Sequence, residues 1–365
     1  MLEGIFIMKK FWIGVATLLL AVTSLAGCGQ QNTTPVKKAP TLVKNPYEDT
    51  QFLMGTVVTL RVYDKGKQSA LNDAFDRIKV LAKETTVNQE GSEVDAVNAQ
   101  AGKKAVKVTP AIYSMIKYAK SYSDKSEGAF DLAIGPITSL WHIGFNDARK
   151  PSQAEIDAKL PLVNYKDVVL NDKKQTVYLK KHGMAIDLGG IAKGFITDQV
   201  VKVLKRDKVT TAIVDLGGNI YVLGHSPKGA NKDWTVGIQD PKKSRGTAIG
   251  TVPAKNMTIV TSGIYERYLK VDGHVYSHLM DPKTGYPFEN NLMGVSIITK
   301  KSVDGDALST ATFDKGLKGG MAFIEKTGYA EAIFITKDKK VYISSGLKKT
   351  FKLLPNSGYT LAELK

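Results

Sequence analysis

Two oxygen-bearing side chains stand four residues apart in the segment Asp304-Gly-Asp306-Ala-Leu-Ser-Thr310. On a helix, this spacing places Asp306 and Thr310 on one face, so that both oxygens can point at the same place. A carboxylate with a hydroxyl suits a hard cation such as Mg²⁺, which takes its other ligands from phosphate and water. The alternative is an aspartate that only caps a helix. We predict a helix over 305–325 with this segment at its start.

A glycine pair leads into a predicted helix from Gly190 to Lys205. Glycines at such a place let backbone N–H groups approach an anion, and the N-terminus of a helix favours negative charge. Lys193 adds a positive charge for a phosphate, and Asp187 can accept a hydrogen bond from a ribose or a base edge. Because the segment matches neither the Walker nor the Rossmann pattern, a plain helix start with tight glycine packing is the alternative.

His278 comes shortly before a predicted turn at Asp281–Gly285. An imidazole there either orients a substrate and carries a proton or serves only the structure. Three tyrosines of the same region, Tyr265, Tyr276 and Tyr286, either stack on a flat ring or pack in a sheet. The sequence leaves both choices open.

The hydrophobic pattern predicts the elements that position these groups. Alternating β-branched residues over 55–63 indicate a strand. Apolar stripes indicate helices over 68–86 and from Thr109 onward, where threonine caps the helix and Pro110 suits its first turn. Further strands are predicted at 211–216, 220–223, 234–238, 257–260 and 293–298, with a closing hairpin over 331–336 and 340–344. The fold class predicted from this order is α+β in one compact unit.

The chain has 365 residues, of which 43% are hydrophobic and 24% charged, and this composition is that of a globular protein with a substantial core. Its formal net charge of +16 comes from lysines and arginines spread along the chain, which indicates a basic, solvated surface. Attraction to anionic lipid, cell wall or a polyphosphate substrate is the functional alternative. No helix-turn-helix, zinc-finger or RNP-like pattern occurs, so we do not expect a nucleic-acid partner.

The single cysteine, Cys28, excludes an intrachain disulfide. Lys9 and Lys10 precede an apolar run from Phe11 to Leu25, which is typical of a secretory signal peptide and short for a membrane span. The run ends in Leu-Ala-Gly-Cys, the pattern at which a lipoprotein precursor is cleaved before a lipidated cysteine. An ordinary signal peptide with a chance cysteine is the alternative.

These features divide the chain into a signal peptide over 1–27, a lipidated cysteine with a flexible tether over 28–48, and a catalytic domain over 49–365. The tether is polar, contains prolines and has no apolar period. Lipid chains would anchor the mature protein to the outer face of the cell membrane without a spanning segment.

Taken together, the motifs resemble those of the ApbE family of FAD:protein FMN transferases over residues 50–350. The matching segments occur in the family's order: Met54–Thr56, Ser92–Glu93 with Asn98, Gly128–Asp131, Asp187–Gly194, Thr261–Gly263 with Tyr265, Tyr276–His278 with Asp281–Pro282 and Thr284–Gly285, and Asp306–Thr310. The resemblance implies an ApbE-like (T-fold-like) α+β domain with mixed sheets and surrounding helices.

The resemblance also implies roles for individual residues. Those expected around FAD are Met54, Asn88, Ala129, Phe130, Asp131, Asp187, Lys193, His278 and Met280. Those expected around Mg²⁺ are Gly190, through its carbonyl, and the side chains of Asp306, Ser309 and Thr310. Many members carry an aromatic residue over the flavin where this chain has Asn88, and the exchange implies that water enters and hydrolyses FAD to FMN and AMP beside transfer.

The implied reaction is Mg²⁺-dependent transfer of FMN from FAD to a threonine hydroxyl of another exported protein, with release of AMP. Such chemistry needs positioning and charge neutralisation more than a protein nucleophile. Asp306, His278 and Lys193 are the predicted catalytic residues, and either Asp306 or His278 would take the proton. The two rival functions are an FAD pyrophosphatase without transfer and a binding lipoprotein that captures a flavin or nucleotide without chemistry, which predicts two lobes joined by crossovers.

Overall fold

The computed structural model describes residues 40–87, 91–229 and 231–364. By contacts the chain divides into Met1–Pro40 and a compact unit, Thr41–Lys365. The predicted signal peptide, Cys28 and most of the predicted tether lie outside the described residues, as does Asn88. Within the described part of the chain, no helix is both long and apolar enough to cross a membrane.

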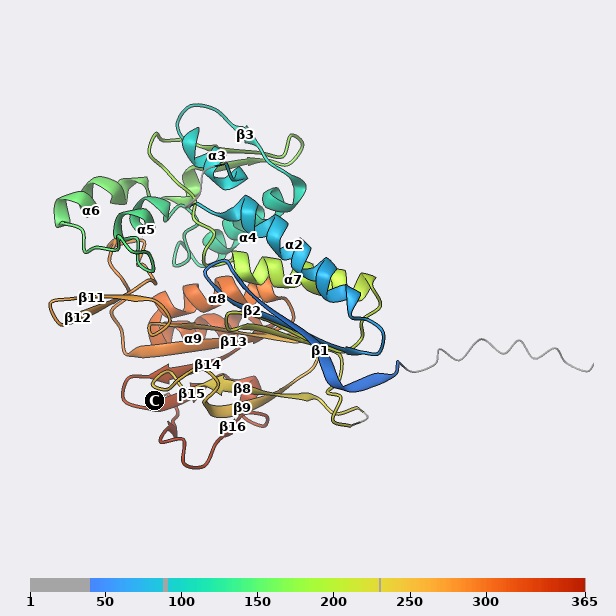
Figure 1. The fold of residues 1–365 in the computed structure, drawn as a ribbon. Helices are drawn as coiled ribbons and strands as arrows, with labels where there is room; N and C mark the ends of the chain where they lie inside the picture. The colour runs from blue at the N-terminus through green and yellow to red at the C-terminus, as the bar shows by residue number, and fades with distance from the viewer. Residues whose placement is uncertain (1–39, 88–90, 230, 365) are drawn as a thin grey trace, which may run out of the picture. The chain divides into compact units, whose positions relative to one another are not determined.

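A nine-stranded sheet runs through the unit Thr41–Lys365 in the order β1-β2-β6-β7-β10-β13-β14-β15-β17 (Figure 1). Neighbouring strands pair antiparallel except β15 with β17. Its strands are β1 Leu42–Leu53, β2 Thr56–Asp64, β6 Ala212–Leu216, β7 Asn219–Leu223, β10 Met257–Gly263, β13 Leu292–Thr299, β14 Glu331–Thr336, β15 Lys340–Ile343 and β17 Thr360–Leu361.

Both faces of this sheet are buried over its central strands. In β13, Ile297 packs toward the helices and the next residue, Ile298, packs on the opposite face, because successive side chains of a strand point to opposite faces. The main helices are α2 Ser69–Thr85, α4 Pro110–Lys125, α7 Ala192–Arg206, α8 Ser302–Asp314 and α9 Gly316–Thr327. The other face carries a small sheet of β16 Lys352–Leu353, β9 Ala248–Ala254 and β8 Trp234–Gln239 (Figure 1).

Shorter elements complete the described part. They are α3 Glu93–Ala99, α5 Gly135–Trp141, α6 Gln153–Lys159, the three-stranded sheet of β3 Val106–Lys107, β5 Thr176–Leu179 and β4 Val168–Asn171, and the hairpin of β11 Tyr268–Val271 and β12 His274–Ser277. Three single-turn 3₁₀ helices lie at Leu160–Leu162, Tyr165–Asp167 and Ser345–Leu347. The predicted α+β class is confirmed, and the two-lobed architecture of the binding-protein rival is not found in the unit 41–365.

The predicted end of the tether at residue 48 is wrong, because β1 begins at Leu42. The polar, proline-containing composition hid this strand, whose pairing with β2 is irregular between Leu42 and Tyr47. Pro46 lies within that irregular stretch, where a residue without a backbone N–H is tolerated.

The single helix predicted over 305–325 is also wrong. The structure has two helices, α8 and α9, separated at Gly316, whose φ of +66° suits glycine and ends a right-handed helix. Helix α8 begins three residues earlier than predicted, because both carboxylate oxygens of Asp198 accept hydrogen bonds from the backbone N–H groups of Ser302 and Val303. Asp306 therefore lies in the second turn of α8 and not at its start.

Candidate functional site

Asp306 is held where α7 and α8 touch. Its Oδ2 accepts a hydrogen bond of 2.8 Å from the backbone N–H of Gly194 in α7, and the side chain is almost fully buried. A Cβ on Gly194 would lie 2.7 Å from the Cβ of Asp306 and closer still to the carbonyl oxygen of Ser302. Only glycine permits this approach, so Gly194 of the glycine-containing segment holds the Asp306 carboxylate in place.

Lys193 supplies a positive charge beside this carboxylate. Its Nζ lies 3.8 Å from Asp306 Oδ1, which is too far for a hydrogen bond and close enough for an ion pair. The lysine side chain is partly exposed whereas Asp306 is buried. Asp306 Oδ1 therefore faces the Lys193 ammonium group without a hydrogen bond, while Oδ2 accepts a hydrogen bond from the backbone N–H of Gly194.

Gly190 and Thr310 meet on the same side of α8. A Cβ on Gly190 would lie 3.3 Å from Thr310 Oγ1 and 3.0 Å from Cε2 of Phe130. Among the described residues, the Thr310 hydroxyl has no hydrogen-bond partner, although hydroxyls in helices often bond to the preceding turn. The structure thus brings Gly190 together with Asp306 and Thr310, which lie more than a hundred residues later in the sequence.

Ser309 is placed differently from these three residues. Its hydroxyl donates to the carbonyl oxygen of Asp306 at 2.8 Å and lies 2.7 Å from the hydroxyl of Ser262 in β10. The residue is fully buried. Ser309 therefore joins α8 to the central sheet.

His278 is neutral and has a defined tautomer. Its Nδ1 lies 3.1 Å from the carbonyl oxygen of Arg267, which can only accept, so Nδ1 carries the proton and Nε2 keeps a lone pair. Burial lowers the pKa of His278 to about 4, and the charges of Arg267 and Lys193 act in the same direction, while the hydrogen bond to the Arg267 carbonyl opposes them.

Arg267 connects His278 to two other segments. Its Nη2 donates to the carbonyl oxygen of Gly55 at 3.0 Å, and a Cβ on Gly144 would lie 3.2 Å from its Cδ. Gly55 and Met54 form the two-residue turn between β1 and β2, with φ values of +66° and +53°, as in a type I′ turn. The guanidinium thereby brings Met54 to the region of His278. Sequence reasoning gave Arg267 no role, because no local pattern marks it.

The residues expected around FAD that the structure describes are mostly held rigidly. Asp187 accepts hydrogen bonds of 2.7 Å from the N–H of Gly189 and from the hydroxyl of Thr138. Asp131 accepts from the N–H groups of Ala133 and Tyr165, and burial raises its pKa. Both carboxylates thus hold loops in place. Ala129, Phe130 and Met280 are buried, and Met280 packs in a small cluster with Ile137, Trp141, Ile143 and Ile156.

The tyrosines of the His278 region pack within the protein. The rings of Tyr276 and Tyr286 lie 5.1 and 5.5 Å from that of Trp141. Trp141 in turn donates from Nε1 to the carbonyl oxygen of Gly285, in the turn predicted at 281–285. Tyr265 is in contact with Gly263 at the end of β10. The packing of Tyr276 and Tyr286 against Trp141 supports the turn that follows His278.

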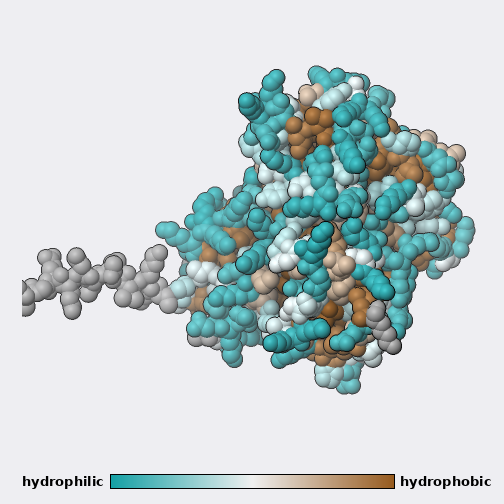
Figure 2. Space-filling model, turned by 180° about the vertical axis from the view of Figure 1, so that it is seen from behind, coloured by the Kyte–Doolittle hydropathy of each residue, from teal (hydrophilic) through white to brown (hydrophobic). Residues whose placement is uncertain are grey.

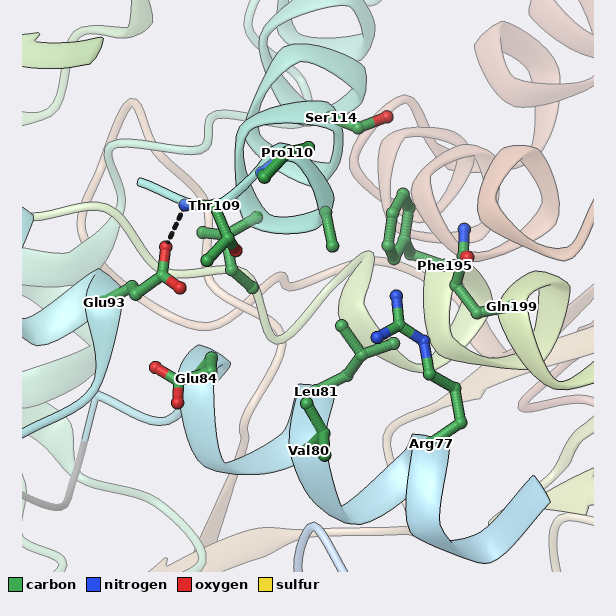
Figure 3. A pocket seen from close by; sticks show the side chains of 12 residues that line it. Arg77, Val80, Leu81, Glu84, Glu93, Thr109, Pro110, Ser114, Phe195 and Gln199 are labelled. Atoms are coloured by element: carbon green, nitrogen blue, oxygen red, sulfur yellow. Dashed lines mark hydrogen bonds between the residues drawn. The ribbon is translucent and has the colours of Figure 1, made fainter. Parts of the chain in front are cut away.

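A surface hollow of about 560 Å³ lies among α2, α4 and α7 and contains none of the predicted site residues (Figure 3). Glu93 at its edge accepts a hydrogen bond of 2.5 Å from the N–H of Thr109, which precedes α4. Within the described ranges, no group of three or more His, Cys, Asp or Glu side chains could hold a metal. The site at α8 has one carboxylate with neutral oxygens, a set that suits a partly hydrated Mg²⁺.

Known proteins share both the sequence and the fold. The family model described as "ApbE family" matches residues 54–334. A protein of Klebsiella pneumoniae (strain 342), named FAD:protein FMN transferase, is 36% identical over 317 residues, which cover 87% of this chain and 97% of the relative. A protein of Treponema pallidum (strain Nichols) with the same name is 34% identical, covering 84% of this chain and 89% of the relative.

Solved structures agree with these relatives. The crystal structure of the ApbE protein from Thermotoga maritima superposes with a TM-score of 0.77 at 30% identity, covering 84% of this chain and 99% of that one. The resemblance found in the motifs is confirmed, since the family match spans most of the chain and both relatives exceed 30% identity. This chain belongs to the ApbE family.

Proposed function

We propose that this protein transfers FMN from FAD to a threonine hydroxyl of an exported acceptor protein and releases AMP. The observation that carries the proposal is the meeting of the two motifs: Asp306 and Thr310 of α8 lie beside Gly190 and Lys193 at the start of α7. The names of the relatives, FAD:protein FMN transferase, support the reaction class.

The oxygens at this place fit Mg²⁺. Asp306 Oδ1 accepts no hydrogen bond from the described residues, and Thr310 Oγ1 is likewise without a partner there. We assign the cation to the Asp306 carboxylate, the Thr310 hydroxyl and the Gly190 carbonyl, with Ser309 as support for α8. When bound, Mg²⁺ would neutralise charge on the pyrophosphate of FAD.

The chain's own groups account for the rest of the reaction. Lys193 would stabilise the negative charge that develops on the phosphate oxygens. The acceptor Oγ forms a bond to the phosphorus of the FMN half, and the bond from that phosphorus to the bridging oxygen breaks, so that AMP leaves with the bonding electron pair. His278 would take the proton of the acceptor hydroxyl at Nε2, because its Nδ1 is already protonated. We therefore favour His278 over Asp306, whose Oδ2 is engaged with Gly194.

FAD would lie over Phe130 and Ala129, between the turn at Met54 and the loop that carries Asp187. Met280, Asp131 and Asn88 complete the proposed set, Asn88 on the sequence resemblance alone. We further propose that lipidation of Cys28 holds the enzyme at the outer face of the cell membrane. Replacing Cys28 by Ser should release the protein from the membrane fraction.

One assay separates the proposed function from its rivals. Purified protein is incubated with FAD, MgCl₂ and, one at a time, exported proteins of the same cell that carry threonines in exposed segments. Transfer gives AMP and a flavin-fluorescent acceptor band after denaturing electrophoresis. AMP with free FMN and no labelled band indicates a pyrophosphatase, and bound FAD without AMP indicates a binding protein. Either of these two results would contradict the proposed transfer.

A further inference from the structure

Exposed apolar side chains occur in each of the three segments that Arg267 joins. Among the described residues, eleven large apolar side chains are exposed, and five of them belong to the three segments that Arg267 joins. They are Phe52 and Val57 beside the β1–β2 turn, Phe145 next to Gly144, and Tyr268 and Val275 of the β11–β12 hairpin. Elsewhere the surface is mainly hydrophilic with separate apolar patches, as the rear face shows (Figure 2).

The β11–β12 hairpin has one packed face and one open face. Leu269 and Tyr276, which oppose each other across the strands, pack against the cluster around Trp141. Tyr268 and Val275 lie on the other face and are 55% and 50% exposed. Their cross-strand partners on that face are the buried Ser277 and the exposed Lys270. The hairpin is a two-stranded sheet of its own, so both outer edges lack a strand partner among the described residues. In Figure 1 it projects from the rest of the fold.

The β11–β12 hairpin is directly connected along the chain to His278, the proposed general base. Strand β11 begins directly after Arg267, and β12 ends directly before His278. At about 3.3 Å per residue, Val275 is roughly 10 Å along the chain from His278. A polypeptide that contacts Val275 therefore lies within a few residues' length of His278.

The turn of β1 and β2 borders the same region from the other side. Phe52 and Val57 oppose each other across the strands, and Phe52 is 73% exposed. Gly55 in this turn is bonded to the guanidinium of Arg267. The exposed pair and the hairpin thus flank one approach to His278.

We propose that this apolar rim, formed by Phe52, Val57, Phe145, Tyr268 and Val275, docks an extended segment of the acceptor protein with apolar residues on either side of its hydroxyl residue. The inference rests on the proposed function, because a macromolecular substrate must deliver its hydroxyl to His278 Nε2. Apolar side chains beside an unpaired strand edge are the features that bind extended polypeptides.

The test compares two sets of variants, using as substrate the acceptor labelled in the assay above. Tyr268→Ser with Val275→Ser alters the rim. Val80→Ser with Val169→Ser is the control. These two valines are also exposed, at 55% and 41%, but lie on α2 and β4, and Val80 lines the hollow of Figure 3. Exposed positions tolerate such changes, so both variants should keep the wild-type unfolding temperature.

We expect the rim variant to raise the KM for the acceptor about tenfold, a factor typical of truncating contact side chains, with kcat and the affinity for FAD unchanged. The control should keep all three values. An unchanged KM in the rim variant, or a higher KM in the control alone, would overturn the docking surface while leaving the transferase activity intact. A fall in kcat at constant KM would also overturn it. If the wild-type chain labels no acceptor, the proposed function fails and the docking surface with it.

Discussion

Lys193 Nζ and Asp306 Oδ1 face each other at 3.8 Å across the contact of α7 and α8. The second carboxylate oxygen is bonded to the backbone of Gly194, the residue next to the lysine. The first turn of α7 therefore both orients the carboxylate and places a cation opposite its free oxygen. A hard divalent ion and a phosphate group are the ligands that such a pair of opposite charges would share.

Replacing Asp306 by Asn should abolish FMN transfer. The change keeps the shape and an oxygen for the Gly194 N–H but removes the single negative charge of the proposed metal site. We expect a loss of at least about 10²-fold in kcat, comparable to the loss of one electrostatic contact in other active sites. Asp304→Asn, two residues earlier on α8, is the control and should keep its activity. Wild-type rates for D306N at saturating MgCl₂ would rule out the metal assignment.

Thr310→Val should weaken metal dependence without weakening the fold. The hydroxyl has no hydrogen-bond partner in the described structure, so its loss leaves no protein group unsatisfied. The MgCl₂ concentration for half-maximal transfer should rise about tenfold, which corresponds to roughly 1.4 kcal/mol. Thr312→Val is the control, because its buried hydroxyl also lacks a partner. An unchanged MgCl₂ dependence in T310V would exclude the hydroxyl as a ligand.

Gly194→Ala should destabilise the protein. The added methyl would lie 2.7 Å from Asp306 Cβ and closer still to Ser302 O, which forces α7 and α8 apart. Overpacking of this kind costs about 1–3 kcal/mol, measurable as a lower midpoint in urea unfolding. Gly319→Ala in α9 is the control: its methyl would lie 3.4 Å from Lys315 Cβ, and alanine favours a helix. Equal stability of G194A and wild type would contradict the conclusion that only glycine permits this approach of α7 and α8.

The pH dependence of transfer should reflect His278. Its folded pKa of about 4 lies below the ordinary value of 6.5, so the imidazole stays neutral on acidification to well below pH 6. The acidic limb of kcat/KM should therefore fall near pH 4 if His278 is the base. If kcat/KM instead falls near pH 6.5, the pKa of His278 is not lowered by burial and this prediction is wrong.

The same shift has a consequence for stability. Between pH 6.5 and 4 the unfolded chain binds a proton at His278 that the folded chain does not, so this contribution is fully present above pH 6.5 and is lost as the pH falls toward 4. Asp198 acts oppositely: burial raises its pKa to about 6, and its contribution is lost as the pH rises through 6. Unfolding curves of wild type and H278Q against pH isolate the histidine. If the free energies of unfolding of wild type and H278Q change in parallel between pH 4 and 6.5, the lowered pKa of His278 is contradicted.

Local patterns in the sequence determined much of this protein. The stripes of α2 and α4 and the alternation in β2 follow from burial of one face, which depends on neighbours three or four residues away in a helix or two in a strand. The four-residue spacing of Asp306 and Thr310 is likewise a local helical pattern, and it predicts that both side chains lie on one face of the helix. The ordered motifs determined the family, because each reflects a local chemical requirement.

Only the tertiary structure decided which residues of these motifs lie in contact with one another. The meeting of Gly190 with Thr310 depends on a close contact of two helices far apart in sequence, and the tautomer of His278 depends on the carbonyl of Arg267. The start of α8 depends on Asp198 of α7, and β1 is a strand because β2 offers it partners. These are contacts between segments separated in the sequence, so no short window along the chain contains the information that places the groups together.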